Sequence, residues 1–121
     1  MSDVTSTVDT YLEMWNETDL ARRAQHIARA WTEHGRYVDP QLQAEGHPAL
    51  GEMVSAVQAK FPGHRFRRTS GVDVHHDHLR FAWELAAPNG IILVAGLDVG
   101  IVAPDGRLEQ ITGFFGDLSA R

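Results

Sequence analysis

Residues 79–116 read LRFAWELAAPNGIILVAGLDVGIVAPDGRLEQITGFFG, three apolar runs separated by two turn signals. The turns are Pro88-Asn89-Gly90 and Pro104-Asp105-Gly106. Each ends in glycine, the residue that adopts a positive φ at the least cost. The segment therefore predicts three β-strands joined by two hairpins.

The middle run, Ile91 to Val102, is apolar on both of its faces. A strand with this pattern is covered on both sides, and helices of the same chain can cover only one of them. We therefore expect the other face to pair with a second copy, in a homodimer. One carboxylate, Asp98, lies in the middle of the run. Burying an unpaired charge there costs several kcal/mol, so Asp98 is expected to be paired or neutral.

The composition is that of an ordinary globular protein. The 121 residues are 43% hydrophobic and 22% charged, contain no cysteine and carry a net charge of -5 with histidine neutral. A negative chain without a basic patch does not favour nucleic-acid binding. The absence of cysteine fits a reducing compartment, and neither a signal peptide nor a run long enough for a membrane span is recognisable. We expect one domain over residues 1–121, cytoplasmic, that binds neither membranes nor nucleic acid.

The chain before residue 79 predicts three helices and two strands. Ser2 or Asp3 caps the first helix, whose apolar positions recur at helical spacing from Val4 to Trp15. The other elements are a second helix from about Thr18 to Trp31 with Arg22 and Arg23 on its solvent side, a short strand at 36–38, a loop, a third helix from about Pro48 to Lys60, and a strand from Phe66 to His75 that turns near His76-Asp77. Helices followed by hairpin-linked strands predict an α+β domain, with the helices on one face of an antiparallel sheet.

Three features of this order carry a resemblance. Asp39-Pro40 follows the first strand, Tyr11 is followed by Asn16 and Asp19, and residues 113–116, Gly-Phe-Phe-Gly, close the last strand. Over nearly its whole length the chain resembles the nuclear transport factor 2-like superfamily, the cone fold. It is most similar to the SnoaL-like polyketide cyclase and ketosteroid isomerase branches. The resemblance implies three N-terminal helices packed on a curved antiparallel sheet.

The resemblance also implies a catalytic site without a cofactor. In ketosteroid isomerases the general base is an Asp directly before a Pro, which matches Asp39, and a second carboxylic acid lies mid-strand, which matches Asp98. Asp98 also matches the acid/base Asp of SnoaL-like cyclases. Tyr11 and a protonated Asp98 would then donate hydrogen bonds to a developing oxyanion, an arrangement for which ketosteroid isomerase is the standard example. The implied substrate-binding residues are Trp15, Tyr37, Met53, Val57, His75, Phe81, Trp83, Ile111 and Phe115.

Each proposed catalytic residue also has a structural interpretation. Asp98 can be hydrogen-bonded to Tyr11 or paired with Arg80 or His75. Asp39 can accept backbone hydrogen bonds at the end of its strand. Tyr11 lies on the apolar stripe of its helix, where packing alone would account for it. If desolvation dominates, the pKa of Asp98 is expected to lie above that of a free Asp.

Two further groups of residues have ordinary interpretations. His75, His76 and His78 are close in sequence, but His76-Asp77 reads as a turn and no further ligands stand at a telling spacing, so we predict no metal site. The run Arg65-Phe66-Arg67-Arg68 is typical of a solvated face, and its alternative is a place around the mouth of the pocket.

The function therefore has three interpretations. The first is a cofactor-independent isomerase or cyclase that acts on an apolar ketone, steroid-, polyketide- or terpenoid-like, by general acid–base catalysis. The alternative is a non-catalytic binding protein for a small apolar ligand, using the same pocket. The third is an accessory domain for protein interaction.

Overall fold

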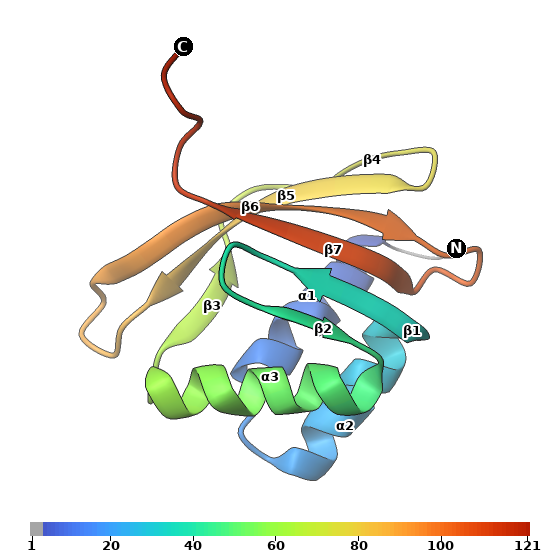
Figure 1. Cartoon of the computed structure of the whole chain (residues 1–121), viewed down its shortest axis with the longest axis horizontal. Coiled ribbons are helices and arrows are strands. Elements are labelled where there is room, and N and C mark those ends of the chain that lie inside the picture. The colour runs from blue at the N-terminus through green and yellow to red at the C-terminus, as the bar shows by residue number, and fades with distance from the viewer. Residues whose placement is uncertain (1–3) are drawn as a thin grey trace.

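The computed structural model describes residues 4–121, so the expected cap at Ser2 or Asp3 lies outside the described residues. Three helices cover one face of a curved sheet of seven strands (Figure 1). The helices are α1 (Val4–Asn16), α2 (Leu20–Ala30) and α3 (His47–Lys60). The strands are β1 (Trp31–Val38), β2 (Gln43–Glu45), β3 (Arg65–Arg68), β4 (Asp73–His75), β5 (His78–Ala86), β6 (Ile92–Val102) and β7 (Leu108–Phe115). The α+β cone predicted from the sequence is confirmed. No helix within residues 4–121 is both long and apolar enough to cross a membrane.

The meander of β5, β6 and β7 forms as the turn residues predict. Gly90 and Gly106 both have positive φ, 87° and 88°, at the ends of the two hairpin turns. The antiparallel register pairs Phe81 with Asp98 and Asp98 with Gly113, which puts these three side-chain positions on one face of the sheet.

The sheet is mixed, whereas a wholly antiparallel one was expected. The strand order is β2-β1-β7-β6-β5-β3, with β4 also paired to β5, and β1 runs parallel to β7. A tight hairpin forces its two strands to be antiparallel, but β1 and β7 are separated by α3 and the whole meander. This long connection lets the two strands lie side by side in the same direction.

Several boundaries differ from the expected ones. Trp31 already has extended backbone, with φ -118° and ψ 142°, so β1 follows α2 directly and is longer than the expected 36–38. The short strand β2 lies within the expected loop. The expected strand 66–75 is two strands, because Ser70 Oγ accepts the hydrogen bond of the Ala82 amide at 2.8 Å and interrupts the ladder. The turn at His76 is confirmed by its φ of 52°.

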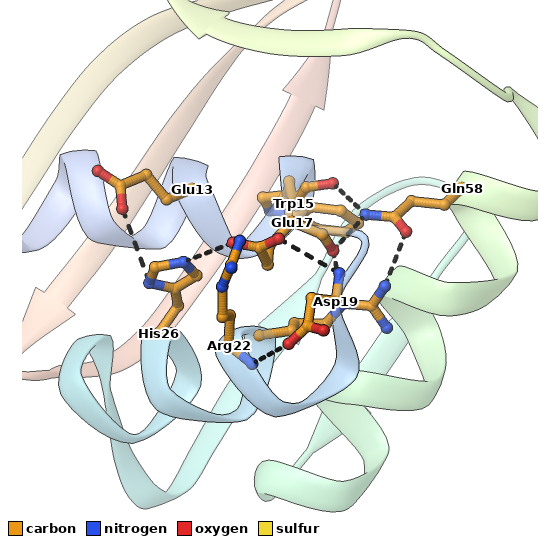
Figure 2. Close-up of polar contacts among 8 residues, drawn as sticks. Glu13, Trp15, Glu17, Asp19, Arg22, His26 and Gln58 are labelled. Atoms are coloured by element: carbon orange, nitrogen blue, oxygen red, sulfur yellow. Dashed lines mark hydrogen bonds and ion pairs between the residues drawn. The ribbon is translucent and has the colours of Figure 1, made fainter.

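A buried polar cluster joins the end of α1 to α3. The Arg23 guanidinium, expected on the solvent side, is buried and donates to the Glu17 carbonyl at 3.0 Å, Ser55 Oγ at 2.5 Å and Gln58 Oε1 at 2.7 Å. Gln58 Nε2 in turn donates to the carbonyls of Trp15 and Glu17, at 2.9 Å each (Figure 2). The last carbonyls of a helix have no partner within it, so this cluster satisfies the end of α1 and holds it against α3.

Candidate functional site

Asp98 lies on the helix-facing side of β6 and is 2% exposed. Tyr11, from α1, donates its hydroxyl to Asp98 Oδ2 at 2.8 Å, and Trp83 Nε1, from β5, donates to Oδ1 at 2.9 Å. Each carboxylate oxygen therefore has one buried donor. Because neither donor is charged, the site supplies hydrogen bonds to Asp98 but no counterion.

Burial dominates the protonation of Asp98. Desolvation and the nearby charge of Asp39 raise the pKa of Asp98 from its ordinary 3.8 to about 7, although the Tyr11 and Trp83 hydrogen bonds act in the opposite direction. The direction agrees with the expectation from the apolar run. Burial, followed by the Asp98 charge, raises the pKa of Tyr11 well above its ordinary value, so the phenol stays protonated and remains a donor.

Of the structural interpretations of Asp98, the hydrogen bond from Tyr11 is the one present. Arg80 lies on the outer face of the sheet and donates to Asp73 Oδ2 at 2.9 Å. His75 is exposed at the paired end of β4 and β5, opposite His78. Neither residue reaches Asp98, so the suggested ion pairs with Arg80 and His75 are wrong.

Asp39 is held at the end of β1 by three donors. The Tyr37 hydroxyl donates to Asp39 Oδ2 at 2.7 Å, and the backbone amides of Gln41 and Leu42 donate to Oδ1, each at 2.8 Å. The two amide bonds form the Asx-type turn considered from the Asp-Pro sequence. They fix the carboxylate in one orientation, with Oδ2 toward the Tyr37 hydroxyl.

Gly113 on β7 lies where the two carboxylates approach each other. A Cβ added at this glycine would lie 2.9 Å from Asp98 Oδ1, 3.2 Å from the Tyr37 hydroxyl oxygen and 3.3 Å from Asp39 Cβ. All three groups thus border one position, and Asp39 is near enough for its charge to act on Asp98. Any side chain at residue 113 would collide with this arrangement, so the glycine is required here for space.

A cavity of about 270 Å³ lies beside this cluster. It is lined by Trp15, Tyr37, Asp39, Gln41, Leu42, Val57, Phe61, Phe66, Trp83, Leu85, Leu93, Val94 and Phe115. Asp39 is the one charged residue among them. Asp98 and Tyr11 do not line the cavity, whereas Trp83, which donates to Asp98 Oδ1, does.

The implied substrate-binding residues lie in three different places. On the cavity wall lie Trp15, Tyr37, Val57, Trp83 and Phe115. Met53, Phe81 and Ile111 lie in the hydrophobic core and do not line the cavity. His75 lies outside the pocket, in a hollow on the outer face with Arg80 and Val99, because β4 presents it away from the helices.

Sequence reasoning missed part of the wall. The run that contains Phe66 was interpreted first as a solvated face and alternatively as part of the pocket mouth; the Phe66 ring packs against Trp15 at 5.2 Å and Trp83 at 5.7 Å between centroids, which agrees with the alternative. The alternation Arg65-Phe66-Arg67 contained the signal, since period two places Phe66 on the face opposite to its arginine neighbours. Gln41, Leu42 and Phe61 lie in loops or at a helix end, where no periodicity indicates direction, and Leu93 lies beside an irregularity in the β5–β6 register.

Within residues 4–121, no group of three or more histidine or carboxylate side chains is placed to hold a metal ion.

The curved sheet, the three helices and the apolar cavity define the class of the protein, an α+β cone of the nuclear transport factor 2-like type. No protein-family model and no curated protein sequence matches the chain. A solved structure does: a proposed isomerase of the SnoaL-like family from Agrobacterium tumefaciens is 38% identical, covers 97% of this chain and 100% of its own, and superimposes with a TM-score of 0.89. The chain therefore belongs to the SnoaL-like family.

More distant structures share the fold alone. A nuclear transport factor 2-like protein of unknown function from Exiguobacterium is 16% identical, with a TM-score of 0.72 over 93% of this chain and 99% of its own. A proposed SnoaL-like polyketide cyclase from Jannaschia is 18% identical, with a TM-score of 0.67 over 95% of this chain and 89% of its own.

Proposed function

We propose that this protein is a cofactor-independent isomerase or cyclase that acts on a small apolar ketone by general acid–base catalysis. The observation that carries the proposal is Asp39: a carboxylate fixed by three donors on the wall of an otherwise uncharged, largely aromatic cavity. A base in such a place can take a proton from the carbon next to a ligand carbonyl. The proposed isomerase and cyclase roles of SnoaL-like neighbours support the same class of reaction.

In this proposal Asp98 and Tyr11 are positioning residues, because the resemblance-based role as donors to the ligand would need them on the cavity wall. Asp98 holds the indole of Trp83 through its hydrogen bond to Nε1, and Tyr11 holds Asp98 from the other side. Trp83 is part of the wall, so its orientation sets the shape of the space beside Asp39.

The cavity size narrows the substrate class. Ligand pockets range over roughly 300–1,000 Å³. At about 270 Å³ this pocket lies just below that range, so a ketone of one or two rings or an open chain suits it better than a four-ring steroid. A small terpenoid or polyketide fragment fits both the size and the aromatic lining.

The test is exchange of α-protons in D₂O, followed by NMR, for a panel of small cyclic and open-chain ketones. We expect exchange of at least one ketone, and we expect Asp39→Asn to reduce its rate by about 10²- to 10⁴-fold. Asp73→Asn is a matched control, since it changes an exposed carboxylate on the outer face and should leave the rate unchanged. A ketone that quenches the fluorescence of Trp15 and Trp83 but never exchanges would favour the alternative, a binding protein. Full activity in Asp39→Asn would contradict the proposal.

We also propose a homodimer formed through the outer face of the sheet. Leu97 and Phe114 are cross-strand partners on that face and are 37% and 55% exposed. Apolar patches of this kind mark protein interfaces. The absence of cysteine fits a cytoplasmic setting, which we propose for this dimer.

A further inference from the structure

Tyr37 is one of the residues that line the cavity, and Tyr11 is not. Among the residues that line the cavity, within the described part of the chain, Tyr37 is the one with a hydroxyl. Its O–H points to Asp39 Oδ2, at 2.7 Å between the oxygens. The Tyr11 hydroxyl donates to Asp98, and Tyr11 lies in the core, with 1% of the residue exposed. A ligand in the cavity would therefore meet Tyr37 and Asp39 together.

We propose that the Tyr37 hydroxyl is the oxyanion donor of this site. When a ligand binds, the hydroxyl donates its hydrogen bond to the carbonyl oxygen of the ligand and no longer to Asp39. The proposal rests on the proposed function and deepens it, because it makes recognition of a carbonyl group the event that frees the base. Ketones would thereby be selected over hydrocarbons of the same shape.

The first argument is the fixed position of the Tyr37 ring. The ring packs edge-on against Trp15, with 5.3 Å between centroids and 68° between planes, and the residue is 4% exposed. Only the hydroxyl hydrogen has to rotate for the donor to change its acceptor. Burial, followed by the charges of Asp98 and Asp39, raises the pKa of Tyr37 above its ordinary value, so the phenol remains a donor.

The second argument is the effect on Asp39. Hydrogen bonds to a carboxylate favour its charged form, so a carboxylate that loses a donor accepts a proton more readily. Asp39 Oδ1 keeps the amides of Gln41 and Leu42, which hold the side chain in place. Of the three donors to Asp39, the Tyr37 hydroxyl is the one that binds Oδ2. Transfer of that single bond therefore leaves an oriented carboxylate with a free oxygen toward the ligand.

The resulting step balances without another reactant. Asp39 Oδ2 takes the α-proton, the electron pair of the C–H bond forms the carbon–carbon double bond of the enolate, and the carbonyl π pair moves to the oxygen that accepts the Tyr37 hydrogen bond. Asp39, now a carboxylic acid, exchanges its proton with the solvent D₂O and delivers a deuteron to the same carbon, which gives exchange, or delivers its proton to the γ-carbon of a dienolate, which gives isomerisation. The Tyr37 hydroxyl then returns to Asp39.

The first experiment compares Tyr37→Phe with Tyr11→Phe, two removals of one hydroxyl that keep the ring. With a ketone that the wild type exchanges, we expect Tyr37→Phe to lower kcat by about 10²- to 10³-fold, the usual effect of losing one oxyanion donor, with a smaller change in KM. Tyr11→Phe should lower kcat less than about tenfold, since it acts through Asp98 and Trp83. Equal losses in the two variants would overturn the assignment of Tyr37.

The second experiment measures the hydrogen bond without turnover. After proton transfer Asp39 is neutral, so Asp39→Asn imitates the site that faces the enolate. The probe is 4-nitrophenolate, a planar oxyanion whose absorbance reports its ionisation. We expect Asp39→Asn to bind it, and Tyr37→Phe in that background to weaken binding by about 10- to 100-fold, the value of a hydrogen bond to a charged group. A change below about threefold, or no binding by Asp39→Asn, would overturn the proposal.

The two proposals fail in different ways. Full exchange activity in Asp39→Asn would remove the proposed function. Loss of exchange in Asp39→Asn together with unchanged exchange in Tyr37→Phe would leave that function in place and remove only the role of Tyr37.

Discussion

Replacement of Asp98 by asparagine tests how this buried carboxyl is held, because the amide keeps the shape of the side chain and removes its charge. The asparagine oxygen can accept from Trp83 Nε1, and its NH₂ can donate to the Tyr11 hydroxyl oxygen. In the structure Tyr11 donates to Oδ2, so on this side the hydroxyl has to rotate and accept, and the same rotation serves a protonated Asp98, whereas the bond from Trp83 is unchanged. Asp98→Asn should therefore fold like the acid form of the wild type at every pH.

The size of the effect follows from the shift in pKa. In the folded protein the pKa of Asp98 is raised from 3.8 to about 7, so the native state binds this proton more tightly than the unfolded chain does. The contribution of Asp98 to the free energy of unfolding is fully present below 3.8, its pKa in the unfolded chain, and is lost as pH rises toward 7. A shift of about three units corresponds to about 4 kcal/mol, or about 1.4 kcal/mol for each pH unit inside the window.

The assay is denaturant unfolding of both proteins at pH 5, 6, 7 and 8. We expect the free energy of unfolding of Asp98→Asn, relative to that of the wild type, to increase by about 1.4 kcal/mol per pH unit up to pH 7. Above pH 7 this difference should change little. Asp105→Asn is the control: Arg107 lowers the pKa of Asp105, so its titration lies below this range and its difference from the wild type should stay constant. If Asp98→Asn instead becomes less stable relative to the wild type as pH rises, the reasoning is refuted, because the ionised form of Asp98 would then be the stabilised one.

Two further changes test the packing and the assembly. Gly113→Ala puts a Cβ 2.9 Å from Asp98 Oδ1. The shift that this contact forces should lower the free energy of unfolding by about 1–3 kcal/mol, measured by thermal or denaturant unfolding. Stability equal to that of the wild type would mean that the carboxyl group has room to move. Phe114→Asp places a charge in the proposed interface and should give a monomer in sedimentation at micromolar concentration. The control Leu118→Asp changes a residue that is 97% exposed and should leave the dimer intact. A wild-type protein that sediments as a monomer would contradict the dimer.

Local sequence determined the meander and the burial of Asp98. The two Pro-Xaa-Gly turns fix the hairpin ends, since each needs a positive φ at its glycine. Period two along β6 then places Asp98 on the same face as Gly96 and Gly100. From that placement alone the direction of the Asp98 pKa shift follows. The three helices were also predictable, because helical periodicity and capping are properties of neighbouring residues.

The site itself was decided by a contact that no local pattern encodes. Strand β1 lies parallel to β7, with Tyr37 beside Ile111 and Val38 beside Thr112, so the chain beyond β1 brings Asp39 to Gly113. The pairing joins segments more than seventy residues apart, and hydrophobic periodicity carries no information about which distant strand is the neighbour or in which register. The sequence therefore identified Asp39 and Asp98 as separate candidates. Only the tertiary structure placed Tyr37 and Asp39 together on the cavity wall and left Tyr11 in the core, because that division depends on how the helices pack on the sheet.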